Sequence, residues 1–323
     1  MPKGTNFSVW PFRFHFRAVD PLYFPEDKAS NVIRGAFGGI FRKLACIPSC
    51  EGVGTCEIAS DCPYALIFEP RQELSFRGGP SGLSDWPRPF VFRALHLDGR
   101  RLVGGEEFYF DLILFEAPEK PLPYFVLAFR ELGRCGLGPG RGRAELQSVE
   151  DLASGLTLYA DQHFTPEVRP QGIHLDFVEA VSAAADRVVV RFETPTELKA
   201  EGGVVEKPEF AVLVARLRDR ISNLRLCYQG GGLEIDFEAI GKAASAVAIV
   251  RSSLRRVEVS RQSSRTGQRH SIGGVVGEIE YRGDLGALVP FLRAGEWTGV
   301  GRQTVWGKGM LGVSLRRAVE AEE

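Results

Sequence analysis

The chain has 323 residues, of which 44% are hydrophobic and 25% are charged, and its formal net charge is −1. This length favours about two domains, and the composition is typical of a soluble globular protein. No hydrophobic run approaches the ~18 residues of a membrane-spanning helix, and the first residues lack the hydrophobic region of a secretory signal. We therefore expect a cytoplasmic protein without a membrane partner, in which the six cysteines are not a disulfide framework.

The first half of the chain predicts alternating strands and helices. Residues 10–17 carry an aromatic side chain at every second position up to Phe16, which is typical of a half-buried strand. Residues 29–46 carry apolar side chains at helical spacing. The further expected elements are strands at 89–97 and 107–115, a helix at 123–132 ended by Gly133, and a connecting segment without clear periodicity at 150–185.

The second half repeats this order. Its expected elements are a strand at 187–192, a helix at 209–226, two strands at 254–260 and 271–281 joined through Thr266-Gly267, a helix at 285–294 and a strand at 311–315. The order strand, helix, strand pair, helix, strand suits the split βαβ or ferredoxin-like unit. We predict an α+β fold of two tandem ferredoxin-like, RRM-like domains: 1–185, with a Cys-rich insertion at 46–62, and 186–323.

A glycine-rich, basic loop near the end of the chain is the most informative motif. It contains Gly299, Gly301, Gly307 and Gly309, with Arg302 and Lys308 between them. Because glycine allows positive φ and has no Cβ, the amides of such a loop can line up as an anion-binding nest. A similar loop at 133–143, which includes Arg141, indicates a duplicated architecture that binds a phosphate chain. A glycine-punctuated hairpin is the structural alternative.

Basic residues are concentrated in the last quarter of the chain. Residues 251–317 contain eleven Arg and one Lys against five acidic residues, a local net charge of +7 that leaves −8 for the rest. Six of these arginines lie within residues 251–269, where Glu258 is the one acid. A solvated surface normally mixes both signs of charge, so this clustering indicates a nucleic-acid-binding surface.

Five segments together resemble a known family. They are Val32-Ile33-Arg34-Gly35-Ala36-Phe37-Gly38, Thr194-Pro195-Thr196, Gly273-Gly274-Val275-Val276-Gly277-Glu278, Leu292-Arg293-Ala294-Gly295-Glu296-Trp297 and the loop 299–309. In this order the chain resembles the CRISPR repeat-RNA processing endoribonucleases of the repeat-associated mysterious protein (RAMP) superfamily. The resemblance implies two ferredoxin-like domains and metal-independent cleavage of the precursor transcript within each repeat. The expected RNA partners are therefore the CRISPR repeat RNA, as precursor and as mature guide RNA.

Cleavage without a metal uses the ribose 2′-hydroxyl as nucleophile and needs a base, an acid and donors for the phosphorane. Histidine suits the acid and base because its pKa lies near neutrality. The catalytic candidates are His270 at the end of the arginine-rich hairpin, His15 on the face of strand 10–17 that carries Arg13, Tyr23 in the following loop, and Arg34 and Lys308 as phosphorane stabilisers. No acidic cluster near the glycine loop could hold a magnesium pair, so we expect no catalytic cofactor.

The RNA-binding candidates are the basic hairpin and the glycine loop, because A-form RNA is read mainly through its backbone and unstacked bases. They are Arg255, Arg256, Arg261, Arg265, Arg269, Gly299, Gly301, Arg302, Gly307, Gly309 and, in the first half, Arg141.

Four of the six cysteines, Cys46, Cys50, Cys56 and Cys62, fall within seventeen residues. Four thiolates suit a structural zinc ion or an iron–sulfur cluster, whereas buried free thiols are the alternative, since no pair has the C-x₂-C spacing.

Two other functions share these features. A non-catalytic guide-RNA-binding subunit of a CRISPR effector complex, with other effector subunits as partners, has the same fold and basic surface. Many relatives carry a histidine near the first helix or just before the glycine loop, whereas this chain has Gly39 and Gly299 in those neighbourhoods, which favours this function. The third hypothesis is a metal-cluster scaffold whose basic surface binds an acidic partner. Cleavage of repeat RNA separates the first two functions, and salt-sensitive RNA binding separates both from the third.

Overall fold

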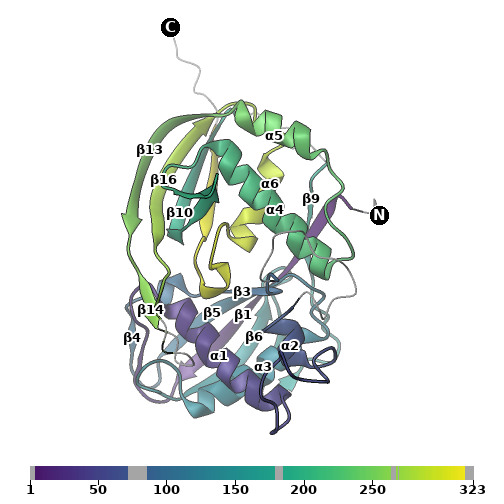
Figure 1. Cartoon of the computed structure of the whole chain (residues 1–323). Helices are drawn as coiled ribbons and strands as arrows, with labels where there is room; N and C mark the ends of the chain where they lie inside the picture. Colours follow the sequence, from purple (N-terminus) through teal and green to yellow (C-terminus); the bar gives the residue numbers. More distant parts are fainter. Residues whose placement is uncertain (1–3, 72–85, 179–184, 263–266, 268, 317–323) are drawn as a thin grey trace.

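The computed structural model describes residues 4–71, 86–178, 185–262, 267 and 269–316. The chain forms two sheet-based units, each with its main helices on one face of a sheet (Figure 1). This confirms the expected α+β class. Arg265, expected to bind RNA, and Thr266, expected at the hairpin tip, lie outside the described ranges. No helix in the described ranges is both long and apolar enough to cross a bilayer.

The first unit has a seven-stranded sheet in the order β3-β5-β1-β6-β7-β8, with β9 paired to the start of β1. Its strands are β1 (Asn6–Ala18), β3 (Phe90–Arg93), β5 (Glu107–Leu114), β6 (Ala144–Asp151), β7 (Leu156–Ala160), β8 (His163–Phe164) and β9 (Ile173–Asp176). Its helices are α1 (Ala29–Ala45), α2 (Pro63–Ile67) and α3 (Pro121–Cys135), and a small ribbon joins β2 (Leu22–Tyr23) to β4 (Arg101–Leu102).

The second unit has a four-stranded sheet in the order β13-β16-β10-β17. Its elements are β10 (Arg187–Thr196), α4 (Phe210–Tyr228), α5 (Phe237–Ser245), β13 (Ala248–Val257), β16 (Gly274–Arg282), α6 (Val289–Thr298), the short helix η3 (Thr304–Trp306) and β17 (Leu311–Arg316). Two small ribbons pair β11 (Leu198–Ala200) with β12 (Gly203–Val205), and β14 (Ser260–Gln262) with β15 (Arg269–Ser271). Strands in corresponding chain positions take the same relative places in both sheets.

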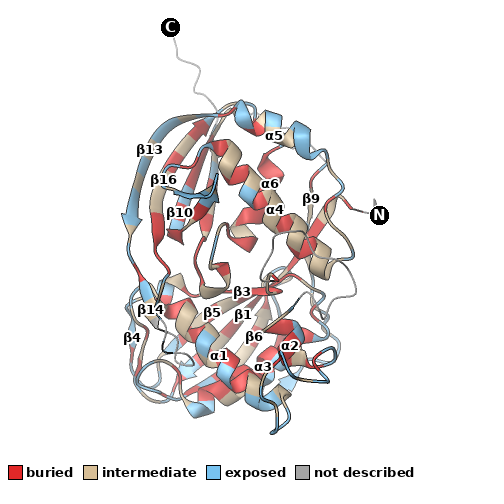
Figure 2. Ribbon diagram, in the orientation of Figure 1, coloured by how far each residue is buried: buried red, intermediate tan, exposed pale blue. Residues whose placement is uncertain are grey.

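Aromatic side chains fill the core of the first unit. The apolar stripe of α1 places Phe37 against α3, where its ring stacks on Phe125 with 4.6 Å between centroids. Phe14 of β1 packs edge-on against Phe129 of α3 at 5.1 Å. Figure 2 shows buried residues between each sheet and its helices. Large aromatic groups bury much apolar area per residue, so this layer stabilises the position of α1.

Strand β1 contributes to both cores. Phe12 and Phe14 are buried against the helices of the first unit, whereas Phe7 and Val9 are buried in the core of the second. Because side chains alternate along a strand, residues 7 and 9 face the opposite side from residues 12 and 14. The first residues of the chain are therefore structural parts of the second unit.

Helix α4 is hydrogen-bonded to the backbone of the first unit. Arg225 Nε donates to the carbonyl of Asn6 at 2.7 Å, and Gln229 Nε2 donates to the carbonyl of Ser8 at 2.7 Å. Tyr228 Oη donates to the carbonyl of Pro87 at 2.5 Å. These bonds satisfy buried polar groups at the contact between the units and fix its geometry.

Several predicted boundaries are wrong. Helix α3 continues through Gly133 to Cys135. Gly133 is needed for close packing, since a Cβ there would overlap the carbonyl of Ala144. The residue that caps this end is Gly136, which has φ +95°. The segment expected at 150–185 as a connector contributes β7, β8 and β9 to the first sheet.

Three further elements differ in detail. The strand expected at 89–97 ends at Arg93, and Leu95–Leu97 is a 3₁₀ turn. Helix α6 begins at Val289, later than expected, and continues to Thr298. Helix α5 was not expected, although Asp236 caps it by accepting a hydrogen bond from the amide of Ala239 at 2.9 Å, which is a common sequence signal for a helix start.

Candidate nucleic-acid interface

Three segments meet beside the beginning of α1: the glycine-rich loop with η3, the β14–β15 ribbon, and α1 itself (Figure 1). The guanidinium of Arg261 on β14 lies 4.0 Å from the centre of the Trp306 ring. Gln303 Nε2 donates to the carbonyl of Ser271 on β15 at 2.8 Å. Gly307 lies so close to Ser30 of α1 that a Cβ would overlap that side chain. The fold thus unites the two motifs that the sequence separates.

His270 faces the glycine loop from β15. It is the partner of Arg261 in the antiparallel β14–β15 ladder. Directly opposed residues in such a ladder carry their side chains on the same face. Because Arg261 covers Trp306, His270 lies on the loop-facing side of the ribbon, and it is half-buried there.

Arg34 on α1 belongs to the same group of cations. Burial, together with the nearby charges of Arg88 and Arg261, lowers the pKa of its guanidinium to about 9. The group lies over the ring of Phe68 at 4.3 Å. Because the charges of Arg88 and Arg261 disfavour the charged form of the buried Arg34 guanidinium, an anion bound beside Arg34 would be stabilised.

Buried donors without partners occur in this group. Among the described residues, Arg34 Nε, Arg261 Nε and Trp306 Nε1 are buried and make no hydrogen bond. A buried donor without a partner costs about 1–3 kcal/mol, so an acceptor at this place would stabilise the protein. Phosphate oxygens and base edges are suitable acceptors.

The glycine loop is not an open nest of free amides. The amides of Gly299, Gly307 and Gly309 donate to the carbonyls of Gly295, Thr304 and Pro195 respectively. The expectation that glycine amides here receive an anion is therefore not supported for these positions. The glycines instead allow close approach, since a Cβ on Gly301 would overlap the carbonyl of Glu197.

Lys308 is buried rather than presented to solvent. It is 4% exposed, and its Nζ donates to the carbonyl of Asp27 at 2.7 Å. Burial lowers the pKa of this ammonium group. Nearby, Asp98 accepts a hydrogen bond from the Ala29 amide at 2.7 Å, and burial raises the pKa of Asp98 to about 6. Lys308 thus fastens the glycine loop to the chain before α1.

Three candidates from the first unit lie apart from this group. His15 is on the sheet face opposite α1, where its Nε2 lies 3.2 Å from Glu150 Oε2. The Tyr23 ring is covered by the Arg101 guanidinium at 4.5 Å. Arg141 is exposed, with φ +49°, in the loop between α3 and β6. That loop and the 299–309 loop occupy corresponding places in the two units, as the duplicated motif predicts.

The remaining candidate arginines differ in how they are paired. Arg255 and Arg269 are exposed and have no hydrogen-bond or ion-pair partner among the described residues. Arg256 is bonded to Glu258 at 2.6 Å, and Arg302 to Glu197 at 2.8 Å. Free cations are the ones that can contact a phosphate without first losing a protein partner.

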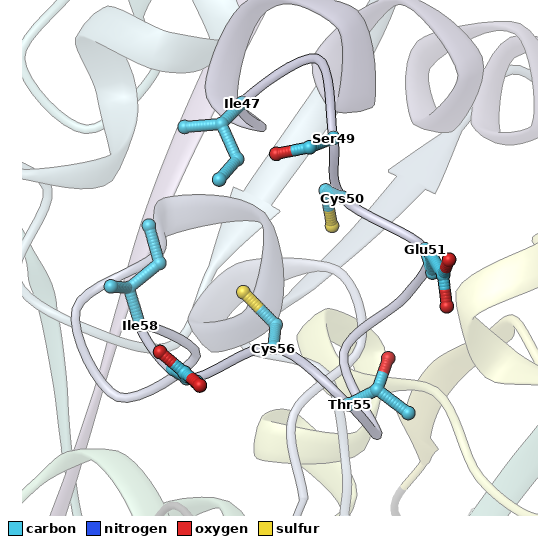
Figure 3. Close-up of a pocket in the computed structure, with 8 residues that line it drawn as sticks. Ile47, Ser49, Cys50, Glu51, Thr55, Cys56 and Ile58 are labelled. Carbon is cyan, nitrogen blue, oxygen red and sulfur yellow. The ribbon is translucent and has the colours of Figure 1, made fainter.

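The four clustered cysteines lie in the loop between α1 and α2, away from the arginine group. Figure 3 shows Cys50 and Cys56 with their sulfur atoms directed into a small pocket of this loop. Within the described ranges, no three His, Cys, Asp or Glu side chains are already arranged as a metal site.

Arg88 and Phe68, which both lie beside Arg34, were not identified from the sequence. Arg88, just before β3, donates through Nε to the carbonyl of Phe68 at 3.2 Å, and the Phe68 ring supports Arg34. Neither has a local motif, because each is brought to α1 by tertiary packing alone.

Known proteins resemble this chain in both units. A family model described as the CRISPR-associated endoribonuclease Cas6 matches residues 190–311, and one described as an N-terminal domain matches residues 7–171. A search of curated proteins finds no match. The stretch matched by the Cas6 model contains the β14–β15 ribbon and the glycine loop.

Solved Cas6 structures share the fold. A Cas6 product complex aligns with a TM-score of 0.54 at 16% identity, covering 95% of this chain and 99% of that one. Thermus thermophilus Cas6 aligns with a TM-score of 0.53 at 14% identity, covering 96% and 99%. A partial Cas6-RT-Cas1–Cas2 complex aligns with a TM-score of 0.55 at 11% identity, covering 98% of this chain and 47% of that one. The chain belongs to the Cas6 family of CRISPR-associated endoribonucleases.

Proposed function

We propose that this protein binds CRISPR repeat RNA beside α1 and cleaves the precursor transcript to give mature guide RNA. The observation that carries the proposal is the meeting of Arg34, Arg261 and Trp306, whose buried donors have no partners among the described residues. Such a group attracts a polyanion, and its unpartnered donors can form hydrogen bonds with the bound polyanion. Family membership supports RNA as that polyanion.

The β13–β16 strands and the β14–β15 ribbon would guide the RNA to this place. Arg255 and Arg269 are exposed and unpaired among the described residues, so they can neutralise phosphates along the approach. Trp306 carries an aromatic face already covered by Arg261, which makes it a structural support more than a base-stacking surface. In this arrangement the glycine loop sets the distance between α1 and the ribbon.

His270 is the best-placed proton-transfer group. The other four histidines lie elsewhere: His96, His163 and His174 are bonded to Tyr109, Asp161 and Ser8, and His15 lies beside Glu150. We propose that His270 exchanges the proton of the 2′-hydroxyl or of the leaving 5′-oxygen, while Arg34 and Arg261 stabilise the phosphorane. The reaction uses no catalytic metal in this proposal.

A non-catalytic guide-RNA-binding subunit remains the second candidate function. It is favoured by the places of Lys308, which is buried on Asp27, and of His15, which faces away from α1. Without Lys308 and His15, His270 is the one remaining candidate for proton transfer, although the reaction normally uses both an acid and a base. Other CRISPR proteins would be the partners of such a subunit.

Incubation with repeat RNA tests the choice. We expect cleavage that is abolished by a 2′-deoxy substitution at the scissile nucleotide, is unaffected by EDTA, and leaves a 2′,3′-cyclic phosphate on the upstream product. A magnesium-dependent 3′-hydroxyl product would contradict the mechanism. Tight, salt-sensitive binding without cleavage would establish the second function instead.

We also propose that each unit is ferredoxin-like, with the boundary at residues 185 and 186. Supporting this, both units run strand, helix, strand, strand, helix, strand, and their sheets place these strands in the same order.

A further inference from the structure

The loop that carries the four cysteines connects the end of α1 to the start of α2. Cys46 follows the last residue of α1, and Cys62 immediately precedes α2. Between them, the Cys50 carbonyl accepts a hydrogen bond from Arg42 Nη2 at 3.0 Å, which holds that part of the loop on α1. The position of α2 therefore depends on how this loop closes.

Helix α2 leads directly into Phe68, which supports the arginine group. The Phe68 ring packs on α1 at Gly38, where a Cβ would overlap it, and the ring also carries the Arg34 guanidinium at 4.3 Å. The Phe68 carbonyl accepts the hydrogen bond from Arg88. Arg34 and Arg88 thus both contact one residue that follows α2.

The cysteines are distributed so that closing the loop would bring them together. The Cys46 thiol, at the start of the loop, interacts with the thiol of Cys50 and with that of Cys62 at the other end of the loop. Cys50 and Cys56 direct their sulfur atoms into the same pocket, which also includes Ile47 and Ile58 (Figure 3). Since no complete ligand set is preformed among the described residues, the loop must contract for all four to share one centre.

We propose that Cys46, Cys50, Cys56 and Cys62 bind one metal centre through four thiolates, and that this centre holds α2 so that Phe68 supports Arg34 and Arg88. The thiolate set suits zinc or an iron–sulfur cluster, and the Cys46–Cys50 spacing lies in the range of structural zinc sites. Metal binding to such a loop stabilises its folded form, because the unfolded loop has no preformed site. The centre then acts on RNA binding through position and not through chemistry, and this second part rests on the proposed function.

Metal content tests the centre itself. Protein purified without chelators should contain about one zinc equivalent per chain, or iron with acid-labile sulfide and a visible absorption band. Cys50→Ser and Cys56→Ser should lose it, whereas Cys135→Ser and Cys227→Ser, outside the loop, should keep it. Wild-type protein without metal, or clustered variants that retain a full equivalent, would overturn the proposal.

RNA affinity tests the link to Arg34. Phe68→Ala should keep the metal and weaken repeat-RNA binding by about threefold to tenfold, as expected for a lost cation–π support. Phe68→Tyr, which keeps the ring, should restore most of the affinity. Cys50→Ser should weaken binding at least as much as Phe68→Ala.

The outcomes separate the two proposals. Unchanged affinity in metal-free Cys50→Ser protein would overturn the link. If the wild-type protein binds no repeat RNA, the proposed function and the link fail together, while the metal measurement still decides the centre.

Discussion

The guanidinium of Arg261 lies 4.0 Å from the centre of the Trp306 ring. This contact joins the β14–β15 ribbon to the glycine-rich loop. A cation–π contact contributes about 0.5–2 kcal/mol, depending on how far it is removed from water. It therefore fixes the spacing between the two segments that we propose bind the RNA.

Trp306→Ala should release Arg261 from its present position and weaken repeat-RNA binding by about tenfold, while Trp306→Phe should retain most of the affinity. Fluorescence anisotropy with labelled repeat RNA measures both. Equal affinity of the alanine variant and the wild-type protein would show that this stack does not position the RNA site.

His270→Ala should reduce the single-turnover cleavage rate by about 10²- to 10⁴-fold, because a proton-transfer group is lost. RNA affinity should change little, since the cations remain. His163→Ala is the matched control, as His163 lies on exposed β8. Cleavage by the His270 variant at the wild-type rate would place the proton transfer on another group.

Removal of the two unpaired arginines, Arg255→Ala with Arg269→Ala, should weaken binding and make its salt dependence shallower. Each lost phosphate contact reduces the log–log slope by ~0.9 on the scale of B-DNA. Arg256→Ala is the control, because Arg256 is bonded to Glu258 and should contribute less. A slope that stays constant in the double variant would remove these residues from the RNA path.

Asp98→Asn should change how stability depends on pH. Burial raises the pKa of Asp98 from 3.8 to about 6, so the folded protein favours the protonated carboxyl. Its stabilising contribution is complete below about pH 4 and is lost as the pH rises through about 6. The difference in Tm between variant and wild type should therefore increase in favour of the variant between these values and then level off.

Thermal unfolding at a series of pH values measures this difference in Tm. Burial also raises the pKa of Glu116 to about 7, but Glu116 is present in both proteins, so its contribution cancels in the difference. A difference that is constant with pH would show that Asp98 titrates normally in the folded protein.

Gly307→Ala should destabilise the protein by about 1–3 kcal/mol, because residue 307 has φ +77° and an added Cβ would overlap Ser30. Gly140→Ala is the matched control in the corresponding loop of the first unit, since a Cβ added there would meet no atom within 4 Å. Urea denaturation gives both free energies of unfolding. Equal values would mean that the loop can move away from α1 at no cost.

Much of the fold could be predicted because its signals are local. The stripe of α1 and the alternation from Phe12 to Phe16 are visible in short windows. Phe7 and Val9 lie on the opposite face of the same strand, and their burial cannot be inferred until the second unit is known to cover that face. The helix end predicted at Gly133 is wrong, because this glycine allows close packing on β6 and that contact is not local.

The candidate site was predictable only as separate motifs. Charge patterning identified Arg261 and the glycine loop, and the ladder of β14 and β15 then places His270 beside them. Burial could not be inferred from residue type, so Lys308 was expected to contact phosphate although it is enclosed beside Asp27. Phe68 has no signal of its own, since its role depends on Gly38 and Arg34.

The division of β1 between two cores has a consequence for how the protein unfolds. A fragment that begins at residue 186 would lack Phe7 and Val9, together with Val91, Ile113 and Phe115, and would expose the apolar surface that these residues cover. Detaching the first strand would likewise open both cores at once. The two halves, although similar in architecture, should therefore unfold in denaturant as one cooperative body with a single transition.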